Sequence, residues 1–361
     1  MSRDRQNLFW VVGIVVFILL LNVLSGVLLP FVAGMAVAYF LDPVADWLEG
    51  KGLSRALATS AILFGFFAIA LGGILLLFPV LQGQVVELVH MVPKILDAVQ
   101  TYIRPEFEQL RDKLPPEALD QIRNVFGDFA GKGIKWITQI IANIWSGGVA
   151  FFNLISLVLI TPIVAFYLLR DWDLITAKLD SWLPRPAAPA IRQQLGEIDT
   201  TIAGFVRGQA SVCLVLSVLY GVGLTMTGLK SGLLVGLAAG FISFIPYLGA
   251  ATGLSIGVGI ALFQYSDVAP IAIVAGIFVF GQTLESYVLT PRLVGDRVGL
   301  HPVWIIFALL AGGALFGFTG VLLAVPVTAV IGVLVRYSIR RYLASPLYMG
   351  ATPTDQSEGP E

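Results

Sequence analysis

Long stretches without a charged residue or a histidine constrain the fold of this chain more than any other feature. Residues 7–41, 231–266 and 303–335 each form such a stretch of more than thirty residues. About 20 apolar residues in a helix already cross a hydrocarbon core of about 30 Å. The whole chain of 361 residues is 57% hydrophobic and only 12% charged, whereas ordinary soluble domains are about 25% charged. The sequence therefore predicts an all-α polytopic membrane protein.

The three longest of these stretches exceed what one straight crossing needs. A single helix over residues 7–41 would be about 52 Å long. Each stretch holds a residue or motif that interrupts helices, namely Pro30, the Pro246-Tyr247-Leu248-Gly249 sequence and the glycines between 312 and 320. We therefore predict three broken or re-entrant helical hairpins, together with four full transmembrane crossings at residues 56–79, 149–169, 207–227 and 268–289.

These segments divide the chain into four parts. Residues 1–79 form an N-terminal membrane hairpin and the first full crossing. Apolar residues recur at helical spacing through 80–148, which predicts an extracytoplasmic cap of amphipathic helices. Residues 149–343 form a membrane transport core with two broken hairpins. The polar, proline-bearing residues 344–361 are predicted to be a disordered cytoplasmic tail.

The distribution of Lys and Arg predicts the orientation. With a cytoplasmic N-terminus, nearly all cations in short loops fall on the cytoplasmic side, and Lys230 alone lies in a short external loop. The seven cations in the long segment 80–148 carry little weight, because long loops translocate largely regardless of charge. We expect a multi-pass protein of the bacterial inner membrane whose two termini are both cytoplasmic.

Glycines recur every fourth residue on both arms of the hairpin at 231–263. This spacing places small residues on one face of a helix, where a second backbone can approach closely. The pattern has two interpretations, a static packing seam or a seam along which the hairpin slides. The positions assigned to hinges or helix packing are Pro30, Gly232, Gly236, Gly240, Gly253, Gly257, Gly313 and Gly317.

A short polar block lies between two of the uncharged stretches, and Glu285 is its central acidic residue. An ionised side chain at the centre of a membrane helix costs about 2.5–3.5 kcal/mol, so it survives mainly where it faces protein or water. Gln282 lies three residues earlier on the same helix face. Glu285 therefore either lines a path for solute or protons, or it reaches the cytoplasmic interface and pairs with Arg292.

The break at Pro246 to Gly249 frees backbone groups at membrane depth, which is tolerated only where protein or a watery cavity satisfies them. Transporters bind substrates and ions at broken helices of this kind. Tyr247 would add a hydroxyl group there, or it would be an interfacial or packing tyrosine. The candidate transport path comprises Glu285, Gln282, Pro246, Tyr247, Gly249 and Arg292.

Several classes of function are disfavoured. The chain has only His90 and His301 as histidines and one cysteine, Cys213, so we expect no metal site, no cofactor and no intrachain disulfide. No sequence motif of a catalytic site or an ATP-binding domain occurs in a suitable context. A net charge of −1 argues against a nucleic-acid partner. The protein is not expected to be an enzyme.

Several short motifs together resemble the autoinducer-2 exporter family of bacterial membrane transporters, which includes the PerM-type permeases. The resemblance covers about residues 8–342. It implies a polytopic, oligomeric transporter, and members of the family are linked to different solutes: a quorum-sensing signal, and sodium or lithium in exchange for protons. The motifs are Leu29-Pro30-Phe31, Ala38 to Pro43, Phe166 to Asp171, Arg207-Gly208-Gln209, Phe244 to Gly249, Gln282 to Pro302, and Gly312 to Pro326.

These observations predict a secondary transporter, not driven by ATP, that exports a small polar organic molecule such as a quorum-sensing signal. One alternative is an antiporter that exchanges sodium or lithium for protons, with Glu285 as the exchanging carboxylate. Another is a membrane scaffold or sensor that acts through the cap at 80–148. The expected partners are the lipid bilayer, a small-molecule or ion substrate, and further copies of the chain in a homo-oligomer.

Overall fold

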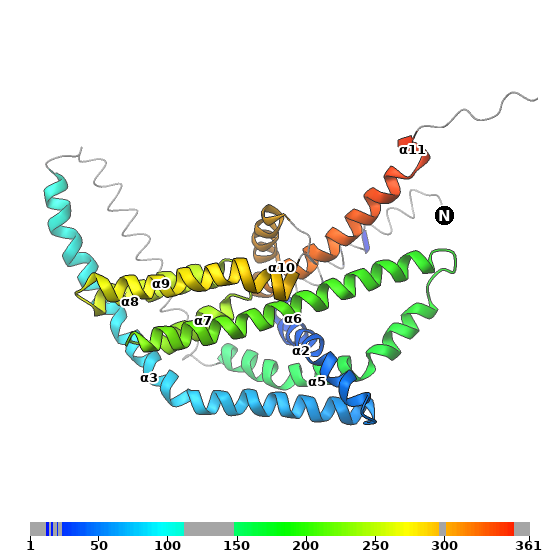
Figure 1. Cartoon of the computed structure of the whole chain (residues 1–361), viewed down its shortest axis with the longest axis horizontal. Helices are drawn as coiled ribbons and strands as arrows, with labels where there is room; N and C mark the ends of the chain where they lie inside the picture. The colour runs from blue at the N-terminus through cyan, green and yellow to red at the C-terminus, as the bar shows by residue number, and fades with distance from the viewer. Residues whose placement is uncertain are drawn as a thin grey trace, which may run out of the picture. The chain divides into compact units, whose positions relative to one another are not determined.

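A computed structural model describes residues 24–111, 148–295 and 301–349, with a few isolated positions before residue 24 (Figure 1). These residues form helices joined by turns, and no strand occurs among them. The prediction of an all-α chain is therefore confirmed for the part that the structure describes.

The chain divides into two compact units, and each is built from segments that are distant in the sequence. Unit 1 comprises residues 1–60, 164–211 and 288–361, and unit 2 comprises residues 61–163 and 212–287. Most of the candidate transport path and the hairpin with the regular glycine spacing belong to unit 2.

Six helices of the described chain are long and apolar enough to cross a membrane. The four predicted crossings at 56–79, 149–169, 207–227 and 268–289 fall on four of them, and the exact number that cross stays a prediction. The six are α2 (Ser25–Glu49), α3 (Arg55–Arg111), α5 (Gly148–Ser181), α6 (Ala188–Met226), α9 (Val268–Leu284) continued by the π-helix η1 (Glu285–Val294), and α10 (Pro302–Leu343).

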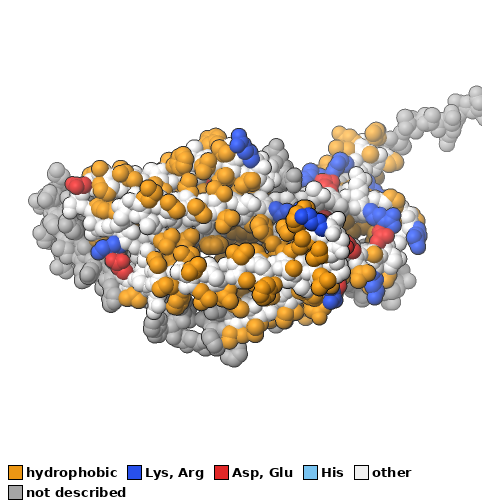
Figure 2. Space-filling view, turned by 60° about the horizontal axis from the view of Figure 1, so that its bottom comes forward, with side chains coloured by type: hydrophobic (Ala, Val, Ile, Leu, Met, Phe, Trp, Pro, Cys, Tyr) orange, Lys and Arg blue, Asp and Glu red, His pale blue; other side chains and the backbone are white. Residues whose placement is uncertain are grey.

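The surfaces of these helices are strongly apolar. Large hydrophobic side chains on α3 stand largely exposed, among them Phe64 at 79% and Leu76 at 80%. In the space-filling view, hydrophobic side chains cover much of the visible face, and the charged side chains gather in a few places (Figure 2). Such contiguous apolar surface needs lipid or protein against it.

The break predicted at Pro30 is wrong. Helix α2 begins at Ser25 and continues through Pro30 and Pro43 to Glu49. Proline removes one backbone donor and crowds the carbonyl four residues earlier. Helix α2 accommodates both prolines, although Pro43 lies well inside it.

The predicted hairpin at 231–263 is present as two separate helices of unit 2. Helix α7 (Gly232–Ile242) ends before a turn, and α8 (Leu248–Gln264) follows it. Helix α8 packs against both α7 and α9, and Figure 1 shows α8 and α9 running side by side. Tyr247 closes the turn with a left-handed backbone at φ 69°.

The glycines of α7 pack on the C-terminal half of α6. A Cβ atom at position 232 would lie 2.8 Å from the carbonyl oxygen of Leu224, and Cβ atoms at Gly236 and Gly240 would overlap the backbones of Gly221 and Ser217. On α8, a Cβ atom at Gly257 would lie 2.8 Å from the ring of Phe278, which also packs against Gly253. The four-residue spacing therefore forms close contacts on two faces of the hairpin, with the backbone of α6 on one and with the Phe278 side chain of α9 on the other.

The last predicted hairpin is also present, within α10. Gly317 has non-helical backbone angles, φ 59° and ψ −141°. The chain folds back there and brings Gly312 against Gly320. A Cβ atom at Gly312 would lie 2.5 Å from the carbonyl oxygen of Gly320. Gly313 lies on the first arm, where a Cβ atom would lie 3.1 Å from Val321.

Two other predicted segments are described only in part. Helix α3 continues past residue 79 as far as Arg111, so the first crossing and the start of the predicted cap form one helix. The rest of the cap, residues 112–147, lies outside the described residues. In the predicted tail, Pro346–Met349 form the short helix α11, and residues 350–361 lie outside the described residues.

Candidate functional site

Glu285 lies at the junction where α9 ends and the π-helix η1 begins. Its side chain is buried, with 8% exposed. It takes part in none of the hydrogen bonds or ion pairs found within the described residues. π-Helical segments are rare and occur frequently at functional sites. A buried carboxylate without a partner, at such a junction, makes this position the centre of the candidate site.

Gln282 lies one turn before Glu285 and is half-buried. Its side-chain amide donates to the hydroxyl of Ser286 across 3.2 Å. This bond orients the amide along the helix and not toward the Glu285 carboxylate. The structure therefore brings Gln282 and Glu285 onto neighbouring positions without a direct bond between their side chains.

Two side chains of α6 complete the surroundings of Glu285. The carboxylate interacts electrostatically with the hydroxyl of Tyr220 and with the thiol of Cys213. Tyr220 is fully buried, and its ring packs on Phe278 at a centroid distance of 4.9 Å. Gly281 allows this arrangement, because a Cβ atom there would lie 2.5 Å from the hydroxyl oxygen of Tyr220.

The turn between α7 and α8 contains three of the predicted path residues. Pro246 is half-buried, and Tyr247 is 55% exposed. Gly249 is buried against α7, where a Cβ atom would lie 2.5 Å from the carbonyl oxygen of Ala239. The exposed Tyr247 side chain thus stands away from the packed interior of unit 2, whereas Gly249 holds the two arms of the hairpin together.

Arg292 lies in η1, in the part of that helix that belongs to unit 1, and its side chain is exposed. The predicted alternative, an ion pair with Glu285, is not among the ion pairs of the described residues. In the same segment, η1 packs on α6 at Gly208, where a Cβ atom would lie 2.8 Å from the carbonyl carbon of Leu293.

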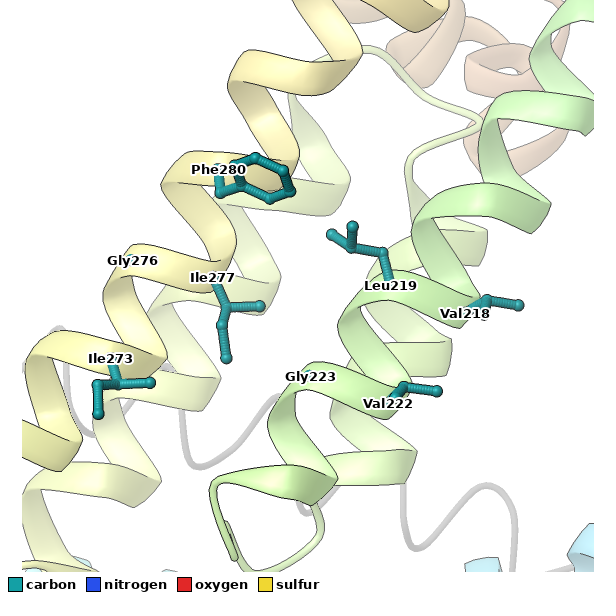
Figure 3. Close-up of a pocket in the computed structure, with 8 residues that line it drawn as sticks. All are labelled: Val218, Leu219, Val222, Gly223, Ile273, Gly276, Ile277 and Phe280. Atoms are coloured by element: carbon teal, nitrogen blue, oxygen red, sulfur yellow. The ribbon is translucent and has the colours of Figure 1, made fainter.

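A groove of unit 2 lies between α6 and α9 (Figure 3). It has a volume of about 600 Å³. Figure 3 shows Ile277 and Leu219 facing each other from the two helices. Every lining residue is apolar or a glycine, so this groove suits a lipid chain or an apolar helix face and not a polar solute. Its lining is Val218, Leu219, Val222, Gly223, Ile273, Gly276, Ile277 and Phe280.

A second polar cluster lies in unit 1. Arg207 on α6 donates to the backbone carbonyl of Tyr39 on α2 across 2.7 Å and pairs with Asp42 across 3.3 Å. The Tyr39 hydroxyl in turn donates to Asp199 across 3.0 Å. These four residues line a cavity of about 60 Å³ together with Trp172. Two of the motifs that carry the family resemblance, Ala38 to Pro43 and Arg207 to Gln209, therefore meet in one place.

Sequence reasoning missed Tyr220 as a part of the site. The sequence offered one signal: Tyr220 is the one tyrosine within the predicted crossing 207–227. Cys213 is buried and forms no disulfide. Its proximity to Glu285 depends on how α6 packs beside α9, which the sequence does not reveal.

Metal ligands are not gathered at the site. Within the residues described, no group of three or more His, Cys, Asp or Glu side chains is arranged to hold a metal ion. The side chains around Glu285 offer one carboxylate, one hydroxyl, one thiol and one amide. This set can accept and donate hydrogen bonds to a small polar group.

The long apolar helices and the two folded-back hairpins define a multi-pass membrane protein. A family model described as "AI-2E family transporter" matches residues 8–340. The chain belongs to this family, as its motifs predict.

Individual relatives are similar over most of their length. The chain is 30% identical over 323 residues to "Putative transport protein YrrI" of Bacillus subtilis (strain 168), which covers 88% of each chain. It is 26% identical over 310 residues to "Putative permease PerM" of Escherichia coli (strain K12), which covers 85% of this chain and 86% of that protein. It is 27% identical over 325 residues to "Putative transport protein MT0215" of Mycobacterium tuberculosis (strain CDC 1551 / Oshkosh), which covers 88% and 84%.

Proposed function

We propose that this protein is a secondary transporter of the bacterial inner membrane that exports a small polar organic molecule, with Glu285 and Gln282 lining its path. The observation that carries the proposal is the buried Glu285 carboxylate, which has no hydrogen-bond or ion-pair partner in the described chain and lies beside a π-helix. Burying a charge without a partner is costly. A group retained at that cost inside a membrane helix is a functional site by default.

The geometry of unit 2 supports a moving element near this carboxylate. Helices α7 and α8 form a hairpin whose arms are interrupted at Pro246 and Tyr247. Broken helices of this type hold substrates in several transporter folds. The tight glycine contacts to α6 and α9 favour a hairpin that moves together with these helices as one packed body, because close backbone packing leaves little room to slide.

An antiporter that exchanges sodium or lithium for protons is the second candidate. It is favoured by the charges near the site, since Lys230 and Asp267 are the only other charged residues between 212 and 287. Lys230 pairs with Glu87 across 3.5 Å, away from Glu285. A lone carboxylate without a protein cation suits exchange of a cation for a proton, although coupled transport usually employs chains of ionisable groups.

The test of the exporter compares the small polar metabolites in the medium of cells that produce the parent protein, Glu285→Gln or Asp267→Asn at equal membrane levels. Asp267 is the matched control, because it is exposed and its side chain caps no backbone group. We expect one or more metabolites to accumulate outside cells with the parent and with Asp267→Asn, but not with Glu285→Gln. Equal accumulation with Glu285→Gln would refute the assignment.

The test of the antiporter uses proteoliposomes that contain a pH-sensitive dye. Sodium added outside would enter in exchange for protons and make the lumen alkaline. This response, and its loss in Glu285→Gln, would favour the antiporter over the exporter. A protein that moves neither solute would favour the third alternative, a scaffold or sensor acting through residues 80–148.

We further propose that the protein is a homo-oligomer with both termini in the cytoplasm. The largely exposed apolar side chains of α3 support contacts between copies as well as with lipid. Native mass spectrometry in mild detergent and in nanodiscs tests the assembly, and a monomer that persists in both would refute it.

A further inference from the structure

The hydroxyl group of Tyr220 is a buried donor that the transport proposal does not use. Tyr220 is fully buried, and its hydroxyl oxygen has no hydrogen-bond partner in the part of the protein that the structure describes. A buried polar group left unpaired costs about 1–3 kcal/mol. Such groups are few in native proteins, and an ordered water molecule or an ion is one of the explanations for those that occur.

The position of the ring is fixed on two sides. Phe278 packs against it at 4.9 Å between centroids, and Gly281 leaves space for its hydroxyl end. A side chain at position 281 would lie 2.5 Å from the Tyr220 hydroxyl oxygen. The hydroxyl therefore lies directly beside α9 at the level of Gly281.

Glu285 is one helical turn further along α9 than Gly281. Side chains of a helix tilt toward its N-terminus, and residues four apart lie one above the other on the same face. The Glu285 carboxylate is thus directed back toward the level of Gly281, where the Tyr220 hydroxyl lies. The two groups interact electrostatically, yet no direct hydrogen bond joins them among the bonds of the described residues.

Within unit 2, the segments of α6 and α7 around this pair carry no charged side chain. Helix α6 contributes Cys213 and Tyr220 on its buried face, and α7 contributes glycines and the backbone carbonyl of Phe241, which the Cys213 thiol approaches at 4.0 Å. Lys230, the one cation between 212 and 287, is bound to Glu87. A neutral hydrogen-bonding molecule is therefore the natural partner of the hydroxyl and the carboxylate.

We infer that one buried water molecule connects the Tyr220 hydroxyl to the Glu285 carboxyl group, and that Tyr220 is a positioning residue of the transport path. This inference rests on the proposed function of Glu285. A water molecule needs two to four polar partners, and the Tyr220 hydroxyl and the Glu285 carboxylate supply two. Bridging waters are nearly as favourable in enthalpy as direct hydrogen bonds. The bridge holds the carboxylate in one orientation and satisfies the hydroxyl.

Infrared spectroscopy of the full-length protein in nanodiscs tests the bridge without a transport assay. The carboxyl stretching band of Glu285 is assigned as the band lost in Glu285→Gln. In Tyr220→Phe we expect this band to shift, because the carboxyl group loses the hydrogen bond that the bridge supplies. Tyr265→Phe is the matched control, since its hydroxyl donates to the carbonyl oxygen of Thr227 across 2.7 Å in the same unit.

A shift in Tyr220→Phe but not in Tyr265→Phe supports the inference, and an unchanged Glu285 band overturns it. A second measurement on the parent protein covers the case in which Tyr220→Phe does not fold. The bridging water should give an O–H stretching band that shifts when the protein is exchanged into water labelled with oxygen-18. The same band should change in Glu285→Gln. A spectrum without such a band overturns the bridge. Normal export by Glu285→Gln would refute the proposed function while leaving the infrared result intact.

Discussion

The backbone of Gly236 on α7 lies directly against the backbone of Gly221 on α6, with no room for a side chain at position 236. Membrane helices associate without a hydrophobic driving force, so packing contacts of this kind carry much of their affinity. The contact fixes α7 beside the helix that carries Tyr220.

Replacing Gly236 by alanine is expected to destabilise the protein by about 1–3 kcal/mol, because the added methyl group must displace backbone and not a flexible side chain. The measurement is the thermal unfolding midpoint of the purified protein in detergent. The matched control is Gly259→Ala, on α8, where a Cβ atom meets nothing within 4 Å. Alanine favours a helix by about 1 kcal/mol over glycine, so the control should unfold at the same or a higher temperature. Equal losses in both variants would contradict the packing seam.

Arg55 joins the start of α3 to α2 and α5 within unit 1. Its guanidinium pairs with Asp42 at 2.9 Å and Glu49 at 3.1 Å, contacts Asp46, and donates to the carbonyl oxygen of Leu169 at 3.0 Å. Its side chain is only 16% exposed. Arginine presents several donors in a rigid fork that a lysine ammonium group does not reproduce.

Arg55→Lys is therefore expected to lower stability by about 2 kcal/mol, the scale of hydrogen bonds to charged groups. Arg192→Lys is the control, because Arg192 and its partner Asp180 are 55% and 40% exposed, and exposed ion pairs contribute about 0–1 kcal/mol. Thermal unfolding of both variants in detergent provides the comparison. A loss in Arg192→Lys as large as that in Arg55→Lys would show that Arg55 is an ordinary surface charge.

Gly317 allows α10 to fold back on itself. Its backbone angles, φ 59° and ψ −141°, lie in a region that side chains rarely adopt. Gly317→Ala is expected to cost about 1–3 kcal/mol through backbone strain, although a Cβ atom there would meet nothing within 4 Å. Gly65→Ala has the same open surroundings but lies inside helix α3, so it should unfold at the same or a higher temperature than the parent. A normal unfolding midpoint for Gly317→Ala would mean that the chain reversal does not require glycine.

The helical class, the long apolar helices at the four predicted crossings, and two of the three hairpins were predictable from the sequence because each depends on local composition. Uncharged stretches longer than a bilayer and glycines at four-residue spacing are properties of neighbouring residues. The continuity of α2 through Pro30 was not predictable in this way. A proline that interrupts a helix and one that a helix accommodates look alike in the sequence, and Pro30 and Pro43 are both of the second kind.

The candidate site was predictable in its charged residue but not in its surroundings. Glu285 is conspicuous because charge is rare in a membrane helix, whereas Tyr220 is one of ten tyrosines in the chain. Their proximity arises from the packing of α6 against Gly281, a contact between residues about sixty positions apart. The cluster of Tyr39, Asp42 and Arg207 similarly joins motifs that the sequence presents separately.

Cys213 provides a reporter of motion at the site, because it is the only cysteine of the chain and is 5% exposed. A membrane-permeant maleimide should label it slowly in native membranes and fully after denaturation. We expect labelling at least about tenfold slower than at an exposed thiol, which corresponds to an opening free energy of roughly 1.4 kcal/mol or more. The control is a Cys213→Ser protein with Tyr247→Cys, since position 247 is 55% exposed.

Gly240→Ala, which separates α7 from Ser217 on α6, should accelerate labelling of Cys213. Equal labelling rates for the parent protein and for the Tyr247→Cys control would show that Cys213 faces solvent and that α6 and α7 do not enclose it.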